Sequence, residues 1–224
     1  MKIKIQEVVD IETDLKEVSA FLSDITPDCV KELGAFFSDN VRQWRIQKQI
    51  TQMKEVKKLV EGAGLEIQKI PLKTLIPILE NSSLEEDPCL EEKWTAMLAN
   101  AASGNREVKP SYPEMLKELS PIEVKILDKM FDDFSLQTEK YEEGKLQQFK
   151  PSKIAEIFQI NEETIELVRD NFLRLNLVKK PSLLRKQTEP NKTVQWAMAL
   201  VDDEDSFHLT ALGFNFIQSC RFKS

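Results

Sequence analysis

Apolar residues recur at helical spacing through most of the first two thirds of the chain. A long series at residues 33–60, interrupted only by Gly34, predicts a helix of about 30 residues or two collinear helices that divide at residues 38–40. A second series follows one side of a helix and consists of Leu90, Trp94, Met97, Leu98 and Ala101. Shorter series predict helices at residues 12–23, 72–81 and 113–119. These helices favour an antiparallel bundle with the long helix as its spine.

Proline and glycine mark the ends of the central helices. Asp87 precedes Pro88, and an aspartate there accepts hydrogen bonds from the N–H groups of the first turn, while proline at the first helical position loses none. Gly104 ends the same series, because glycine readily takes the left-handed conformation of a helix C-cap. Ser120 and Pro121 repeat the cap-then-proline pattern. We therefore expect helices that begin at residues 88 and 121.

The pattern changes after residue 120. Helices are predicted at residues 121–134, 152–158 and 161–176, and a closing helix at residues 210–222. Strands are predicted at residues 177–180, 194–201 and 207–209. Ser152 and Asn161 are the expected caps of the second and third helices. Three helices followed by a β-hairpin form the layout of a winged helix-turn-helix domain.

These elements define the predicted fold. The chain is mostly α, with an antiparallel helical bundle at residues 1–119 followed by a winged-helix-like domain with a small β-hairpin at residues 120–224. A chain of 224 residues is long enough for one large or two small domains, each with a buried core. The presence of only six glycines agrees with a helical architecture.

Composition narrows the class of protein. Hydrophobic residues make up 41% of the chain and charged residues 31%, which is typical of a soluble globular protein. Apolar runs reach about six residues, far short of the roughly 20 of a membrane helix, and no secretory signal follows the start. The three cysteines Cys29, Cys89 and Cys220 lack metal-ligand spacing and suit reduced thiols. We expect a cytoplasmic protein.

Charge is unevenly distributed along the chain, whose net charge is −7. One stretch, at residues 41–60, is basic and has Glu55 as its single acid. Its basic residues are Arg42, Arg45, Lys48, Lys54, Lys57 and Lys58. Another stretch, at residues 84–92, is acidic and holds no base; its acids are Glu85, Glu86, Asp87, Glu91 and Glu92. The two stretches are candidate partner contacts, and they have the charges to pair within one subunit or between subunits.

The residues offer no catalytic centre. His208 is the only histidine, and its place in a strand beside an acidic turn is typical of a surface or wing residue rather than a general base. The acidic stretch lacks the alternating, glycine-bearing spacing of a calcium loop. The cysteines form no zinc set, and no phosphate-binding loop or nucleophile elbow occurs. We expect a protein that is not an enzyme and that takes no metal or cofactor.

Nucleic acid is the alternative partner. The helix at residues 161–176 would read DNA in a winged helix, but its first half is acidic and would be repelled by phosphates. A nucleic-acid-binding regulator would instead use the basic stretch at residues 41–60, with further bases near the wing. Those bases are Lys179, Lys180, Arg185 and Lys186. A protein partner, or a second copy of this chain, agrees better with the charge pattern.

Three segments resemble one bacterial family. They are FFSDNVRQWRIQKQI, IPLKTLIPILENSSLEEDPCLEEKWTAMLANAASG and PSYPEMLKELSPIEVKIL. They are similar to the Abi-alpha (abortive infection alpha) family, in which a helix containing "W..LLANA" precedes an "HPS…LK.LSP.EA..L" segment. The resemblance covers about residues 33–130. Two departures are Lys109, where a histidine is common, and Met97 in place of the first leucine of the pair.

The resemblance implies a part in phage defence by abortive infection. It carries no motif that defines a reaction, so the implied role is that of a sensor, regulator or adaptor that acts by binding. An effector toxin with a chemistry not visible in the sequence is a third, lesser alternative.

Overall fold

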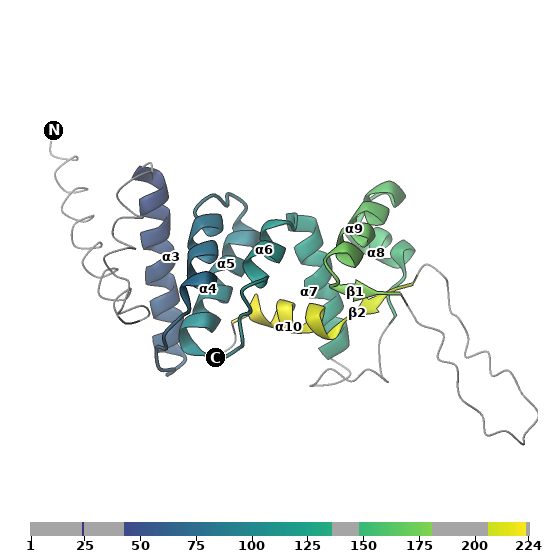
Figure 1. Ribbon diagram of the computed structural model, residues 1–224. Coiled ribbons are helices and arrows are strands. Elements are labelled where there is room, and N and C mark those ends of the chain that lie inside the picture. Colours follow the sequence, from purple (N-terminus) through teal and green to yellow (C-terminus); the bar gives the residue numbers. More distant parts are fainter. Residues whose placement is uncertain (1–23, 25–42, 136–147, 181–205, 223–224) are drawn as a thin grey trace, which may run out of the picture. The chain divides into compact units, whose positions relative to one another are not determined.

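The computed structural model describes residues 24, 43–135, 148–180 and 206–222, and within them the chain is mostly helical with one small antiparallel sheet (Figure 1). The helices are α3 (Gln43–Gly62), α4 (Leu72–Ser82), α5 (Pro88–Ser103), α6 (Tyr112–Lys117), α7 (Pro121–Ser135), α8 (Pro151–Phe158), α9 (Glu162–Arg174) and α10 (Ala211–Ser219). The strands are β1 (Val178–Lys179) and β2 (His208–Leu209). The prediction of a mostly α chain is therefore confirmed.

The chain divides into two compact units. Met1–Pro121 and Phe216–Ser224 form the first, which we call the helical unit. Ile122–Asn215 forms the second, which we call the sheet unit because it holds both strands. The division falls inside α10, so the two ends of one short helix are counted with different units.

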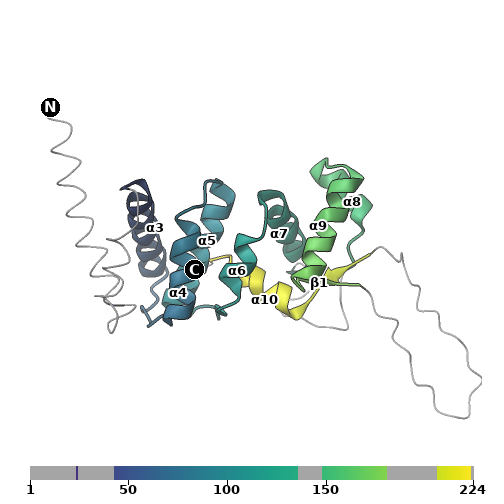
Figure 2. The same cartoon turned by 45° about the horizontal axis from the view of Figure 1, so that its top comes forward.

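The core of the helical unit lies around α5. This helix packs against α3 and α4, and α4 also packs against α6 (Figure 2). On α3 the buried apolar residues recur at the spacing expected for one face of a helix, at Ile50, Met53, Val56 and Val60. On α5 the indole of Trp94 is buried. Burial of such a set is the main stabilising contribution to the unit.

Both predicted ends of α5 are confirmed. Asp87 is its N-cap, and the side chain accepts hydrogen bonds from the backbone N–H groups of Cys89 and Leu90. Gly104 is its C-cap, with a left-handed φ of 64°. A side chain there would also meet Gln68, whose Oε1 lies 2.5 Å from the position of a Cβ at residue 104. Glycine is thus required for the left-handed conformation, whereas the exposed end of the Gln68 side chain could move aside.

A segment from the C-terminal part of the chain completes the helical unit. The Asn100 side chain on α5 donates hydrogen bonds to the backbone carbonyls of Ser219 and Arg221, at 2.9 and 3.1 Å. These carbonyls lie at the end of α10, where helical partners run out. The Phe216 ring contacts the Tyr112 ring edge to face, with centroids 5.6 Å apart. Residues 216–221 are therefore part of this core, although about a hundred residues separate them from α5.

The sheet unit is built on aromatic packing. The ring of Phe214 lies between those of Phe131 and Phe134 on α7, at centroid distances of 4.9 and 5.3 Å. Gly213 allows a close approach of α10 to the chain before β1, because a Cβ at this residue would lie 2.1 Å from the carbonyl oxygen of Leu177. The same carbonyl accepts the backbone N–H of Thr210 at 3.0 Å.

The other described elements of the sheet unit are α8, α9 and three extended segments. A turn of three residues joins α8 to α9, and Gln159 in it has a left-handed φ of 52°. β1 pairs with β2 so that Val178 faces Leu209 and Lys179 faces His208. On the chain before α8, Phe149 forms an antiparallel bridge with Phe207.

Several predicted helix starts are confirmed, and one predicted cap is wrong. The expected helices that begin at residues 72, 88 and 121 are present, and Asn161 caps α9 by accepting from the N–H of Thr164. The prediction that Ser152 caps α8 is wrong, because Pro151 is the first helical residue and Lys150 occupies the cap position without a side-chain bond. The segments predicted at residues 1–42 and 194–201 lie outside the described residues, apart from the single helical residue Asp24.

Candidate functional site

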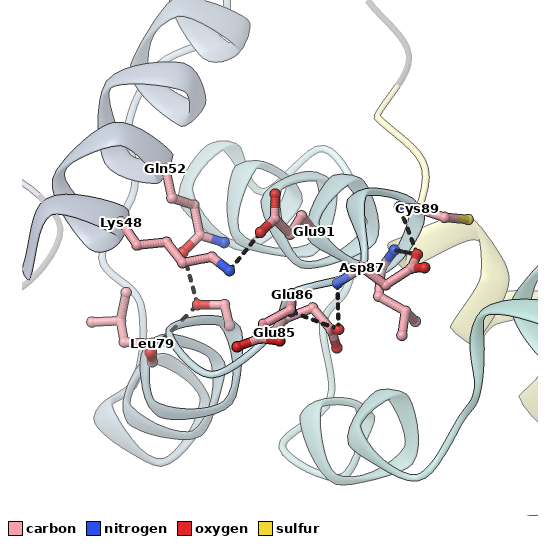
Figure 3. A network of polar contacts seen from close by, with 10 residues as sticks. Lys48, Gln52, Leu79, Glu85, Glu86, Asp87, Cys89 and Glu91 are labelled. Atoms are coloured by element: carbon pink, nitrogen blue, oxygen red, sulfur yellow. Dashed lines mark hydrogen bonds and ion pairs between the residues drawn. The ribbon is translucent and has the colours of Figure 1, made fainter. Parts of the chain in front are cut away.

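The predicted acidic stretch forms the junction between α4 and α5, and Figure 3 shows how its carboxylates are used. The Glu85 side chain accepts the backbone N–H groups of Glu86 and Asp87, both at 3.0 Å. Asp87 in turn accepts from the N–H groups of Cys89 and Leu90, at 2.9 and 3.3 Å. These two carboxylates therefore fix the loop and start α5, where negative charge is also favoured by the helix dipole.

A third acidic residue meets the basic stretch. The Lys48 ammonium on α3 lies 2.5 Å from the Glu91 carboxylate on α5 (Figure 3). Both side chains are partly exposed, so the pair contributes at most about 1 kcal/mol to stability. The sequence left pairing within or between subunits open, and this pair lies within one chain.

Buried polar contacts hold the end of α4 against α3 below the junction. The Gln49 side chain donates to the carbonyl of Leu79 at 3.1 Å, and the Ser82 hydroxyl donates to the side-chain oxygen of Gln52 at 2.8 Å. All four residues are buried or nearly so. Buried hydrogen bonds of this kind fix one geometry, because breaking them would leave polar groups without water. These hydrogen bonds therefore hold the end of α4, and the junction that follows it, in a fixed position on α3.

Three side chains of the junction are exposed and take no part in the contacts that fix the loop. Glu86 and Glu92 are exposed, and neither side chain takes part in the contacts that fix the loop. Leu84, just before them, is 57% exposed, which is unusual for a large apolar side chain in the described part of the chain. We call Leu84, Glu86 and Glu92 the junction surface. An apolar side chain among carboxylates is suited to hold a protein that brings an apolar pocket and positive charge.

Leu84 is absent from the contact residues predicted from the sequence. Those residues are all charged, so an exposed apolar side chain was not among them. The available signal was position, because Leu84 follows the last turn of α4 and lies off the buried series Leu75, Ile78 and Leu79. A side chain beyond the end of a helix has no neighbouring turn to cover it.

The other predicted contact residues are dispersed. Lys54 is partly exposed and Lys58 exposed on α3 of the helical unit, whereas Lys179 and Lys180 belong to the sheet unit. Arg42 lies outside the described residues, and only the backbone of Arg45 is described. Lys48 contacts the acidic stretch through its ion pair with Glu91. The set remains a prediction.

His208 corrects one sequence prediction. It was expected at the surface or on the wing, but its side chain is only 4% exposed. The reason is that its strand is covered on both faces, since Phe207 and Leu209 on either side of it are buried as well. A strand covered on both faces leaves no exposed position for alternate residues.

Tyr112 is the titrating group with the clearest shift. Its ring is buried, and burial raises the pKa of the hydroxyl to about 12, with smaller contributions from Glu107 and Cys220. The hydroxyl has no hydrogen-bond partner among the described residues. At neutral pH it is therefore a neutral, buried group.

Within the described residues, two further features are absent: a group of metal ligands and a helix able to span a membrane. No group of three or more His, Cys, Asp and Glu side chains in this part of the chain is arranged to hold a metal ion. None of the helices described here has the length and apolar character needed to cross a bilayer.

Comparison with known proteins gives one match. A family model described as abortive infection alpha matches residues 42–220, which is most of the chain. No curated protein and no solved structure matches the chain.

Proposed function

The chain belongs to the abortive infection alpha family, and on that premise we propose that it serves in anti-phage defence by binding another protein, as a sensor, regulator or adaptor, and catalyses no reaction. The family supports the link to abortive infection. The binding role is supported by the chemistry of the junction surface.

One observation supports this proposal: at the α4–α5 junction some acidic side chains make structural contacts, whereas others remain exposed beside an exposed leucine. Glu85, Asp87 and Glu91 are engaged in loop, cap and ion-pair contacts. Leu84, Glu86 and Glu92 remain exposed on the same short segment. Charged side chains set the rate and register of an encounter, and an apolar side chain supplies affinity once it is buried. The junction surface offers both.

We further propose that the sheet unit has the winged-helix arrangement. In support, α7, α8 and α9 are followed by the antiparallel pair of β1 and β2, in the order that this fold requires. The bridge between Phe149 and Phe207 adds a third extended segment between the first and second helices, where winged helices carry their first strand. The short turn between α8 and α9 has the length of a helix-turn-helix connection.

The proposal is tested in bacteria that carry the gene on a plasmid. We expect wild-type protein to protect the culture against a sensitive phage, and the variant Leu84→Ser, Glu86→Lys, Glu92→Lys to lose protection by about tenfold or more in plaque number. The substitutions are at exposed positions, so the free energy of unfolding should change by less than about 1 kcal/mol. Circular dichroism of the purified variant checks this.

The matched control is Glu61→Lys, Glu66→Lys, which reverses two exposed acids of the same unit and changes net charge equally. Full protection by this control, with loss in the junction variant, supports a local binding surface. Equal loss in both variants would assign the effect to net charge and contradict the proposal. Turnover of a nucleotide, nucleic acid or peptide by the purified protein would overturn its non-enzymatic part.

A further inference from the structure

The outward side of α9 differs from that of a helix that reads DNA. Its buried side is an apolar series of Ile165, Val168 and Phe172. Its exposed residues recur at the spacing of one helical face and are Glu163, Glu166, Leu167, Asp170 and Arg174. We call these five residues the α9 face.

Leu167 is the central residue of the α9 face. It is 66% exposed, the highest value among the large apolar side chains that the structure describes. Ile157 on α8, the helix packed against α9, is another exposed large apolar side chain. Full burial of such a side chain is worth about 1.5–3 kcal/mol, so a partner that covers Leu167 gains affinity directly.

The charged residues around Leu167 indicate that the partner's surface is positively charged. Three of the five residues of the α9 face are acidic, and Glu162 at the start of the helix is one further exposed acid. The Arg169 side chain is only 12% exposed and forms ion pairs with Glu166 and Asp170, so it offsets part of their negative charge. The helix as a whole carries four acidic residues against two basic ones and is therefore still net negative. Arg174 is held by the Asn171 side chain at 2.6 Å.

A polyanion such as DNA would be repelled by this face. Affinity for nucleic acid depends on neutralising phosphates, and here carboxylates occupy the positions where lysine and arginine would be needed. A positively charged protein segment meets the opposite condition. Its charges would be attracted by Glu163, Glu166 and Asp170, while an apolar side chain would be buried against Leu167.

We propose that the α9 face binds a basic helix of another protein, rich in lysine or arginine and carrying a leucine-sized side chain that covers Leu167. This inference rests on the proposed function and specifies the charge and the apolar side chain of the binding partner. It places the contact on the helix that other winged helices use for DNA, with the charge preference reversed. The partner is a different protein, because the basic helix of this chain, α3, already buries its apolar residues Ile50, Met53 and Val56 in the core of the helical unit.

The probe is a fluorescein-labelled amphipathic peptide of about 16 residues, with leucines on one face and lysines on the other, added to the full chain. We expect Leu167→Ser and Glu163→Lys, Asp170→Lys each to weaken its binding by about tenfold in fluorescence anisotropy. Ile157→Ser, on α8 and outside both the α9 face and the junction surface, is the control for loss of an exposed apolar side chain. Glu61→Lys, Glu66→Lys is the control for the change in net charge.

Selective loss in the α9 variants, with both controls within about twofold of wild type, supports the inference. Equal loss in the charge control would show attraction by net charge alone and overturn it. So would binding of duplex DNA that Leu167→Ser abolishes, or a dimer in light scattering that the α9 variants dissociate. If these variants keep wild-type peptide binding while the junction variant still loses phage protection, this inference fails and the proposed function stands.

Discussion

At the scale of single residues, Tyr112 combines a stabilising contact with a destabilising one. Its ring packs edge to face on Phe216, which favours folding, while its hydroxyl is buried with no hydrogen-bond partner among the described residues. A buried polar group in this condition costs about 1–3 kcal/mol. Tyr112→Phe keeps the ring contact and removes the hydroxyl. We therefore expect a free energy of unfolding equal to that of wild type at pH 8, or higher by about 1 kcal/mol.

The pKa of Tyr112 makes this prediction depend on pH. The pKa is 10.0 in the unfolded chain and about 12 in the folded protein, so the neutral form is favoured by folding. Below pH 10 the hydroxyl is neutral in both states and stability is unaffected. As pH rises from 10 towards 12, the unfolded state loses the proton first and wild type is destabilised relative to Tyr112→Phe, by about 2–3 kcal/mol at the upper end.

Urea denaturation of both proteins at pH 8, 10 and 11.5 measures the difference. A gap that widens with pH agrees with the buried hydroxyl, since other groups titrate equally in the two proteins. A constant gap would mean that the Tyr112 hydroxyl is accessible to water in the folded state.

Exposure of single side chains was the least predictable property at this scale. Leu167 and His208 have the residue types of a core and a surface, and the structure reverses both. Leu167 lies between the buried Ile165 and Val168, so the helical period alone places it on the outward side. His208 is covered because both faces of its strand are buried, and no local pattern shows that a strand is covered on both faces.

At the scale of elements, α5 depends on the Asp87 cap. Replacement by alanine removes the acceptor for two backbone N–H groups, at Cys89 and Leu90. We expect Asp87→Ala to lower the free energy of unfolding by about 1 kcal/mol, within a range of 0.5–2. The midpoint of urea unfolding, followed by tryptophan fluorescence, measures the loss because Trp94 lies on this helix.

Two comparisons isolate the cap. Asp87→Asn keeps an acceptor oxygen without the charge and should retain most of the stability. Glu86→Ala removes an exposed carboxylate next to the cap and should change the free energy by less than about 0.5 kcal/mol. A loss in Glu86→Ala as large as that in Asp87→Ala would contradict a specific capping role.

The ends of elements were predictable where the sequence contains a chemical signal. Asp87, Gly104 and Asn161 all cap as expected. The same logic applied to Lys150 and Pro151 would have placed the start of α8 correctly, because proline at the first helical position fixes the boundary. The need for Gly213 could not be inferred, since the obstructing Leu177 carbonyl belongs to a segment more than thirty residues earlier.

At the scale of the whole molecule, the negative net charge predicts that the chain does not bind nucleic acid. The chain has a net charge of −7, and the exposed positions of α9 are mainly acidic. We expect no binding of short RNA or DNA duplexes at about 50 mM salt in fluorescence anisotropy. A tight complex with a steep log–log salt dependence, weakened by Lys58→Glu or by Lys179→Glu, Lys180→Glu, would favour the nucleic-acid regulator instead.

The family and the helical class were accessible from sequence, because they depend on local periodicity and on short motifs near Trp94 and Ser120. The junction surface and the α9 face were accessible only in part. Their acidic residues were visible, but which of them are engaged in caps and ion pairs depends on contacts such as that between Lys48 and Glu91. Such contacts join elements that are far apart along the chain.

One such contact has a consequence for synthesis on the ribosome. The Asn100 side chain and the Tyr112 ring find their partners in residues 216–221, which are translated after the whole of the sheet unit. Domains commonly fold in order of their emergence, the earlier before the later. Here the nascent helical unit must wait with that part of its core open. It closes only when α10 has left the exit tunnel, so a premature stop codon near residue 215 would damage the half of the protein that was made first.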